Sequence, residues 1–99
     1  MLNIEKKTNG TELTIALAGR LDTTTAPELE TVVKESLDGV TALILDMEAL
    51  EYVSSAGLRV LLSAQKVMNK QGTMKVTRVG ETIMEIFEVT GFSDILDIE

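Results

Sequence analysis

The chain has 99 residues and a formal net charge of −7, with 44% hydrophobic residues, no histidine and no cysteine. This length suits one domain over residues 1–99 with a packed core, and the scarcity of aromatic residues predicts an aliphatic core. The acidic excess disfavours nucleic acid and anionic lipid as partners, because clustered Lys and Arg bind both. The missing His and Cys exclude a Ser-His-Asp triad, a disulfide and a thiol nucleophile.

No apolar run is long enough to span a bilayer, and no basic segment followed by an apolar stretch marks a signal peptide. We therefore expect a cytoplasmic protein without membrane insertion. A metal site would have to consist of oxygen ligands alone, and nothing in the sequence indicates a cofactor.

The N-terminal residues alternate between apolar and polar, as in a half-buried edge strand, with Leu2 and Ile4 on the apolar face. Asn9-Gly10 then separates two alternating runs, and this dipeptide is a strong hairpin signal because both residues tolerate positive φ. The second run has apolar residues on one face and alanines on the other, namely Leu13, Ile15 and Leu17 against Ala16 and Ala18. The sequence therefore predicts an antiparallel pair of strands.

The first helix is expected to begin near Thr25, which fits a capping box with Glu28, and to stop at Gly39. Its apolar face consists of Leu29, Val32, Val33 and Leu37. Residues 40–45 form a nearly continuous apolar run, typical of a central strand that is covered on both faces. Asp46 is expected to end that strand.

The second half of the chain is predicted to alternate helices and strands, with Gly72 and Gly91 ending two of the helices. The expected elements are a helix from about Ser55 to Gln71, a more exposed strand over residues 74–79, a helix from Glu81 to Val89 and a short strand or strand-like tail over residues 92–98. After Arg78 the chain has six acidic residues and no basic one. This acidic stretch is interpreted either as a solvated face or as a surface for a basic partner.

The resulting order predicts an α/β fold with a mixed, mostly parallel β-sheet, an N-terminal antiparallel hairpin and about three main helices. Binding sites in such sheets lie at the carboxyl ends of the parallel strands. Asp22 follows the second strand, whereas Asp46 and then Ser54-Ser55 follow the third. We therefore expect these residues to share one edge of the sheet.

Ser54 and Ser55 stand where a buried strand passes into an amphipathic helix. The start of a helix has unpaired backbone N–H groups and a partial positive charge, so anions bind there readily. A serine at this place either caps the helix or accepts a phosphate. Arg59 follows one turn after Ser55, where it faces a phosphate, a partner's carboxylate or solvent.

The segment Tyr52-Val53-Ser54-Ser55-Ala56-Gly57-Leu58, with Leu45-Asp46 and Gly19-Arg20-Leu21-Asp22 before it, resembles the STAS domain of bacterial anti-anti-sigma factors. The similarity extends over essentially the whole chain in element order and length. It implies an anti-sigma factor antagonist whose unphosphorylated form binds an anti-sigma factor and releases a sigma factor. The anti-sigma factor of that family is also a serine protein kinase that phosphorylates the antagonist, and a protein phosphatase reverses this step.

The family pattern is usually Asp-Ser-(Ser/Thr)-Gly-Leu, with the first serine as acceptor. Alignment on Gly57-Leu58 implies that Ser55 accepts the phosphate. Ser54 then replaces the family's Asp and is either a rival acceptor or a cap, and Ala56 replaces its second hydroxyl. The resemblance also matches Asp22 and Asp46 to acidic residues near the family's phosphorylation site.

Gly57 has two interpretations, close packing of the helix on a strand or close approach of a partner. An enzyme is disfavoured, since the sequence contains neither His nor a phosphate loop of the G-x-x-x-x-G-K type. The alternative function is a STAS scaffold or a sensor of a nucleotide or lipid, without phosphorylation. We expect a monomer.

Overall fold

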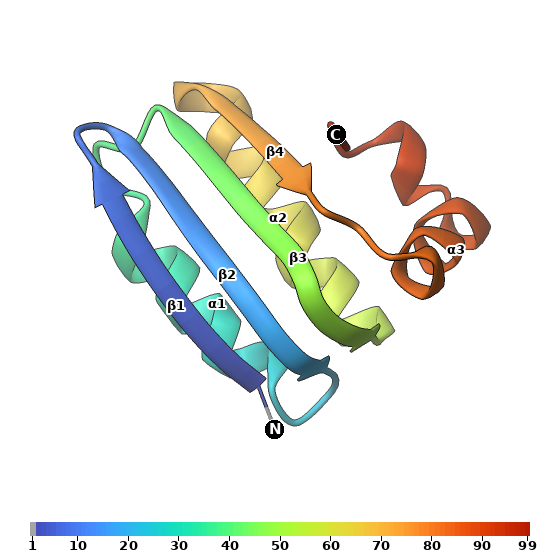
Figure 1. Cartoon of the computed structure of the whole chain (residues 1–99). Helices are drawn as coiled ribbons and strands as arrows, with labels where there is room; N and C mark the ends of the chain where they lie inside the picture. Colours follow the sequence, from blue (N-terminus) through green and yellow to red (C-terminus); the bar gives the residue numbers. More distant parts are fainter. Residues whose placement is uncertain (1) are drawn as a thin grey trace.

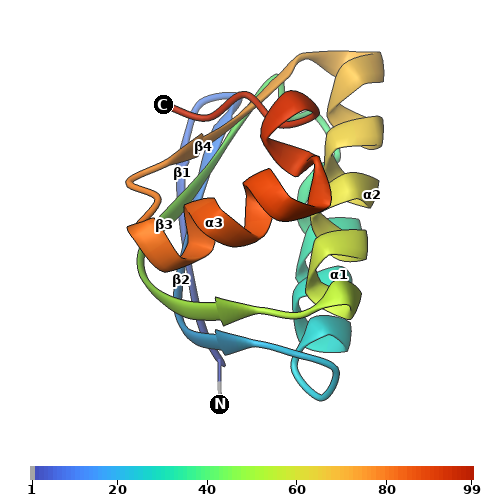
Figure 2. The ribbon, with the colours of Figure 1, turned by 90° about the vertical axis from the view of Figure 1, so that its right-hand side faces the viewer.

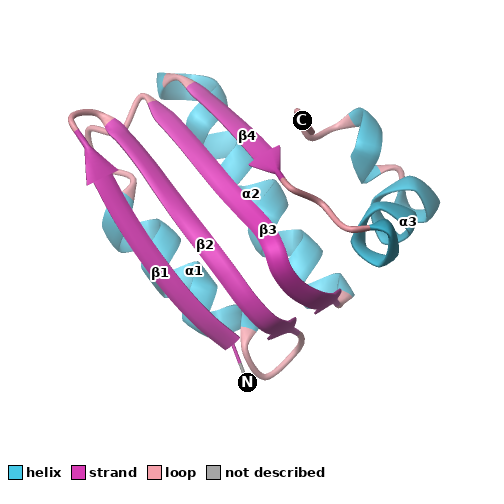
Figure 3. Ribbon diagram, viewed as in Figure 1, coloured by secondary structure: helices cyan, strands magenta, loops and turns pink. Residues whose placement is uncertain are grey.

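The computed structural model describes residues 2–99, which form a four-stranded sheet and three α-helices (Figures 1 and 3). The strands lie in the order β1-β2-β3-β4; β1 runs antiparallel to β2, and the other neighbours are parallel. This confirms the predicted α/β fold. In chain order the elements are β1 (Leu2–Asn9), β2 (Glu12–Leu21), α1 (Ala26–Ser36), β3 (Ala42–Val53), α2 (Ser55–Gln71), β4 (Thr73–Thr77), α3 (Glu81–Thr90) and a short 3₁₀ helix, η1 (Phe92–Asp94).

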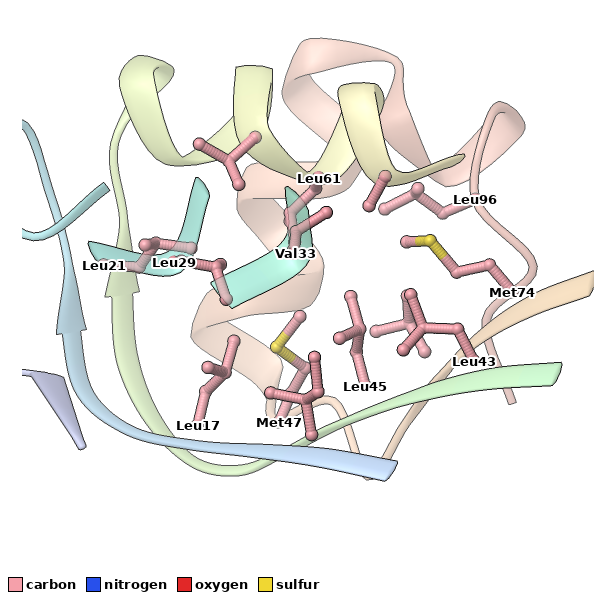
Figure 4. Packing of buried hydrophobic residues seen from close by; sticks show 14 of the residues in the cluster. Leu17, Leu21, Leu29, Val33, Leu43, Leu45, Met47, Leu61, Met74 and Leu96 are labelled. Carbon is pink, nitrogen blue, oxygen red and sulfur yellow. The ribbon is translucent and has the colours of Figure 1, made fainter. Parts of the chain in front are cut away.

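One face of the sheet is covered, and the core lies between that face and the helices. Figure 2 shows α1 and α2 on the same side of the sheet, with α3 beside the edge formed by β4. The core is aliphatic as predicted, and Phe87 is the aromatic side chain that is fully buried in it. Figure 4 shows part of this cluster, including Leu17, Leu21, Leu29, Leu45, Met47, Leu61 and Leu96.

The opposite face of the sheet has no helix over it in the described part of the chain (Figure 2). The prediction that the third strand is covered on both faces is therefore wrong. Leu43 and Leu45 are buried under the helices, whereas Ile44 and Asp46 between and after them are partly exposed. An apolar residue such as Ile44 tolerates a half-exposed position in a sheet, so hydrophobicity alone did not distinguish the two environments.

Asp46 does not end the third strand, so this prediction is also wrong. β3 continues to Val53, which lies opposite Leu21 at the end of β2. Two register shifts between β2 and β3 lie on the way, each giving β3 one additional residue, and such bulges bend a strand and increase its twist. Figure 1 shows the end of β3 curving toward the start of α2. Roughly 20 Å of strand therefore separates Asp46 from the serine segment.

Asp46 is tolerated in mid-strand because it lies on the open face and pairs with Arg78. The guanidinium of Arg78 contacts the carboxylates of both Asp46 and Glu48, and its Nε donates to Asp46 Oδ1 over 3.1 Å. Arg78 itself has φ 54°, in the left-handed region, directly after β4. Hydrogen bonding from Arg78 holds the pKa of Asp46 below its ordinary value.

We predict that this pair makes part of the fold's stability depend on acid pH. Because the folded-state pKa of Asp46 is lowered, its contribution is present above the unfolded pKa of about 3.9 and is lost as the pH falls through the folded value. The difference in free energy of unfolding between the wild type and Asp46→Asn should therefore shrink from pH 7 to pH 2.5, measured by urea titration. When both proteins also carry Arg78→Gln, the difference in free energy of unfolding caused by Asp46→Asn should depend little on pH. If that difference depended on pH as strongly as it does with Arg78 present, the pairing of Asp46 with Arg78 would be contradicted.

The C-terminal tail differs from the short strand or strand-like tail predicted for residues 92–98, apart from a single bridge at Ile98. Gly91 adopts φ 82°, η1 follows, and Leu96 packs into the core. Ile98 makes one isolated parallel bridge to Val76, with Val76 N donating to Asp97 O over 2.8 Å. The tail therefore covers a single position on the edge of β4, because its apolar residues pack as a helical turn rather than alternate along a strand.

Candidate functional site

The site lies where β2 and β3 end side by side. Ser54 N donates to Leu21 O over 2.8 Å, which joins the two strand ends directly. The loop after β2 and the start of α2 therefore emerge at the same edge. The structure thus places Asp22 close to Ser54-Ser55 in the fold, whereas it places Asp46 elsewhere, on the open face.

Asp22 shapes the loop before α1 through hydrogen bonds to the backbone. Its Oδ1 accepts from Thr24 N at 3.0 Å and from Thr25 N at 3.1 Å, and also from the Thr24 hydroxyl at 2.7 Å. These bonds, chiefly that from the Thr24 hydroxyl, lower the pKa of Asp22. An ionised carboxylate therefore stands beside the serine segment.

The predicted capping box between Thr25 and Glu28 is wrong. Thr25 occupies the N-cap position of α1, but its side chain makes no capping bond. Its hydroxyl instead donates to Arg20 O over 2.8 Å and accepts from Asp22 N over 2.8 Å. These bonds hold the buried hydroxyl toward the preceding turn, so it does not cap α1.

Ser54 and Ser55 have different environments. Ser54 is the N-cap of α2, and its Oγ accepts from Gly57 N at 3.3 Å. Ser55 is the first residue of the helix, is exposed, and its hydroxyl has no hydrogen-bond partner among residues 2–99. Ser54 therefore acts as a cap, while the Ser55 hydroxyl is free to react or to contact a partner.

We predict that Ser54→Ala lowers the free energy of unfolding by about 1 kcal/mol, because it removes the N-cap of the longest helix. Ser55→Ala is the matched control on the neighbouring residue, and it should change stability by less than about 0.5 kcal/mol. Urea unfolding of the two variants at pH 7 measures both effects. Equal losses in the two variants would mean that Ser54 does not cap α2.

Gly57 is buried and packs against the end of β2. A Cβ at this position would lie 2.7 Å from Leu21 Cγ and 3.0 Å from Leu21 O. Leu58 is likewise buried. The first of the two interpretations therefore applies to Gly57: its lack of a side chain lets α2 approach the end of β2.

Ala56 and Arg59 lie on the accessible side of α2. Together with Thr23 and Pro27 they line a shallow hollow between the starts of α1 and α2. Arg59 is exposed and makes no ion pair with any residue in 2–99. An uncompensated guanidinium thus lies one helical turn after Ser55.

One further pair at this edge, Arg20 with Tyr52, was not predicted. Arg20 lies 4.5 Å from the centre of the Tyr52 ring, a cation–π geometry, and its Nε is 3.9 Å from Asp22 Oδ2. Arg20 and Tyr52 are opposite each other only because of the bulges in β3. No local feature of the sequence indicates that register.

Residues 2–99 contain no group of three acidic side chains placed to hold a metal ion. No helix in this range has both the length and the apolar character needed to cross a membrane.

The site thus stands on a mixed four-stranded sheet with helices on one face and an exposed serine at the start of α2. The family model of the STAS domain matches residues 3–99, and the chain belongs to this family. It is 29% identical over 98 residues to the anti-sigma-B factor antagonist of Bacillus subtilis, covering 98% of this chain and 90% of that protein. It is 30% identical over 99 residues to the protein of the same name from Staphylococcus aureus, covering 98% and 92%.

Solved structures show the same fold. An anti-sigma factor antagonist from Mycobacterium paratuberculosis superposes with a TM-score of 0.89 at 22% identity, covering 99% of this chain and 85% of that one. The antagonist SpoIIAA in its unphosphorylated form gives a TM-score of 0.70 at 17% identity, covering 100% and 87%. The phosphorylated form of Bacillus SpoIIAA gives 0.68 at 17% identity, covering 98% and 91%.

Proposed function

We propose that this protein is an anti-sigma factor antagonist that is switched by phosphorylation of Ser55. The unphosphorylated form binds an anti-sigma factor and so releases a sigma factor; phosphorylation ends the complex. The observation that carries the proposal is the exposed Ser55 hydroxyl, free of hydrogen bonds to residues 2–99, beside a serine that already caps the helix. The names of the Bacillus and Staphylococcus relatives, and the existence of SpoIIAA in two phosphorylation states, support it.

The switch acts on the interface and leaves the fold intact. A phosphate adds about −1.5 to −2 charges at pH 7, and at the start of a helix a negative charge stabilises the fold by about 0.3–1 kcal/mol. Within an interface built around a neutral hydroxyl, the same charge loses its hydration without gaining a partner and weakens binding. Arg59, one turn later, supplies a guanidinium to the phosphate in the free protein.

The contact surface comprises residues around Ser55. The Asp22 loop, Ser54, Ala56 and Arg59 face the partner, whereas Gly57 and Leu58 support the helix from within. Asp46 is not part of this surface, because it lies on the open face of the sheet.

The proposed partners are an anti-sigma factor that is itself the serine protein kinase, and a protein phosphatase that restores the unphosphorylated form. In this scheme the chain is a substrate and a binding protein rather than an enzyme. It acts as a monomer in the cytoplasm, where bacterial transcription takes place.

Mass spectrometry after incubation with ATP and the anti-sigma factor from the source cell tests the proposal. We expect one phosphate on Ser55, absent in Ser55→Ala and retained in Ser54→Ala. Phosphate on Ser54 would move the switch by one residue and contradict the assignment of the cap. No phosphorylation of the wild type by a kinase that binds it would contradict the switch.

The alternative function is a scaffold or a nucleotide or lipid sensor, and it stays open because Ser54 stands in place of the family's Asp. Asp and Ser are both strong N-caps, and Ser54 makes the capping bond to Gly57 N. The exchange therefore conserves the local structure. Saturable binding of a nucleotide or lipid without phosphorylation, measured by calorimetry, would support the alternative.

A further inference from the structure

The charge of the chain is concentrated at its C-terminal end. Residues 79–99 carry six of the sixteen acidic side chains and none of the nine basic ones, so this segment has a net charge of −6 out of the total of −7. The remainder of the chain is nearly neutral. Glu99 is paired, because its Oε1 lies 2.9 Å from Lys75 Nζ. The glutamates of α3, in contrast, form no ion pair within residues 2–99.

Glu81, Glu85 and Glu88 form one stripe on the accessible side of α3, at the spacing of successive helical turns. The half-buried side chains of Val79 and Met84 lie among these glutamates and line the same shallow groove. The helix is held in place from below by Ile83 and Phe87, which are buried in the core. The groove is thus acidic at its rim, apolar in part of its floor, and fixed to the fold; Figure 1 shows α3 beside β4, at the end of the molecule away from β1.

Glu81 in the first turn suits the dipole of α3, but the other two glutamates of the stripe are unfavourable for the helix. Like charges one turn apart destabilise a helix by about 0.2–0.5 kcal/mol per pair. A carboxylate near the C-terminus, such as Glu88, also opposes the helix dipole. The last turns of α1 and α2 carry Lys34 and Lys70, whereas the last turn of α3 has no basic residue.

An apolar side chain next to this stripe is also exposed. Val89 is 87% exposed, and Ile95 just after η1 is 47% exposed. Among residues 2–99 the only other large hydrophobic residue in the exposed class is Val67, which is 40% exposed. The glutamates of this stripe therefore have no ion-pair partner among residues 2–99, and Val89 has no apolar cover there, whereas Val79 packs against the core.

We propose that the α3 surface, defined as Val79, Glu81, Met84, Glu85, Glu88 and Val89, is a second protein-docking surface, and that its occupant is a basic amphipathic helix of a partner protein. A helix lying along the groove offers one Lys or Arg per turn to the glutamate stripe and apolar side chains to Met84 and Val89. The negative charge repels nucleic acid and anionic lipid. The inference stands apart from the serine switch, since it uses a different helix and an unmodified surface.

The test is an NMR titration of the full ¹⁵N-labelled chain with a synthetic amphipathic helical peptide of Leu and Lys. We expect shifts centred on residues 79–90. Glu85→Gln combined with Glu88→Gln should weaken binding roughly fivefold, the effect of losing two exposed ion pairs. The control pair Glu35→Gln with Asp38→Asn removes the same charge from exposed positions near the end of α1 and should change affinity less than twofold.

Two further variants complete the design. Val89→Ser should weaken binding about threefold without a change of charge, and Ser55→Asp should bind the peptide as the wild type does. Shifts spread evenly over all acidic surfaces, or an equal loss in the control pair, would overturn the proposal. An effect of Ser55→Asp on peptide binding would show that the two surfaces are one, and would likewise overturn it while leaving the serine switch intact.

Discussion

Ser55→Asp is expected to weaken binding of the anti-sigma factor about a hundredfold, while Ser55→Ala retains it. The aspartate brings a charge to the exposed start of α2, where the proposed interface meets a neutral hydroxyl. Burial of that charge without a counter-ion costs several kcal/mol, and ~2.8 kcal/mol already corresponds to a factor of about one hundred. Calorimetry with the purified partner measures the difference.

Ser63→Asp is the matched control for this experiment. Ser63 is also exposed on α2, two turns further along, so the substitution adds the same charge to the same helix away from the serine segment. We expect it to reduce affinity by less than a factor of three. Unchanged binding in Ser55→Asp, or an equal loss in Ser63→Asp, would argue against an interface centred on Ser55. A displaced α2 in the phosphorylated structure would argue against a switch that acts by charge alone.

Gly72→Ala is expected to lower the free energy of unfolding by about 3 kcal/mol or more. Gly72 ends α2, and a Cβ there would lie 1.9 Å from Thr41 O and 2.6 Å from Thr41 C. Both neighbours are backbone atoms, so no change of rotamer relieves the overlap. Movement of Thr41 would break its hydrogen bond from Thr73 N, 2.9 Å long, at the point where β3 and β4 begin to pair. For a domain of this size the melting temperature should fall by about 15 °C.

Gly80→Ala is the control, because a Cβ at Gly80 meets no atom within 4 Å. Gly80 is the N-cap of α3, so alanine should cost less than about 1 kcal/mol there. Urea and thermal unfolding of the two variants give the comparison. Similar stabilities for both would mean that α2 and the start of β3 are less closely packed than the structure describes.

Much of the fold follows from local sequence. The bounds of α2 were predicted as they are found, because an apolar stripe repeats along residues 55–71 and Gly72 stops it. The antiparallel hairpin was predicted correctly from Asn9-Gly10, but the turn lies one residue further on: Asn9 still pairs with Glu12, and the turn residues are Gly10, with φ 63°, and Thr11. Periodicity and turn chemistry act over a few residues, so they can be read without knowledge of the rest of the chain.

Tertiary contacts decided the points on which local sequence was misleading. Asp46 looked like the end of a strand, but the open face and Arg78, which follows it by 32 positions, let the strand continue. The Arg20–Tyr52 pair depends on bulges that only the pairing of β2 with β3 reveals. The local sequence predicts that the Thr25 side chain caps α1, yet its hydroxyl donates to Arg20 O instead.

The serine segment shows both contributions. By itself the sequence determined that a serine pair stands at the start of a helix, and through the family pattern it favoured Ser55 as acceptor. Only the tertiary structure showed the environment of each hydroxyl: Ser54 N donates to Leu21 O, and Ser54 Oγ accepts from Gly57 N. Which serine caps the helix and which faces solvent depends on where α2 begins, and it begins directly after the residue whose N–H joins the end of β2.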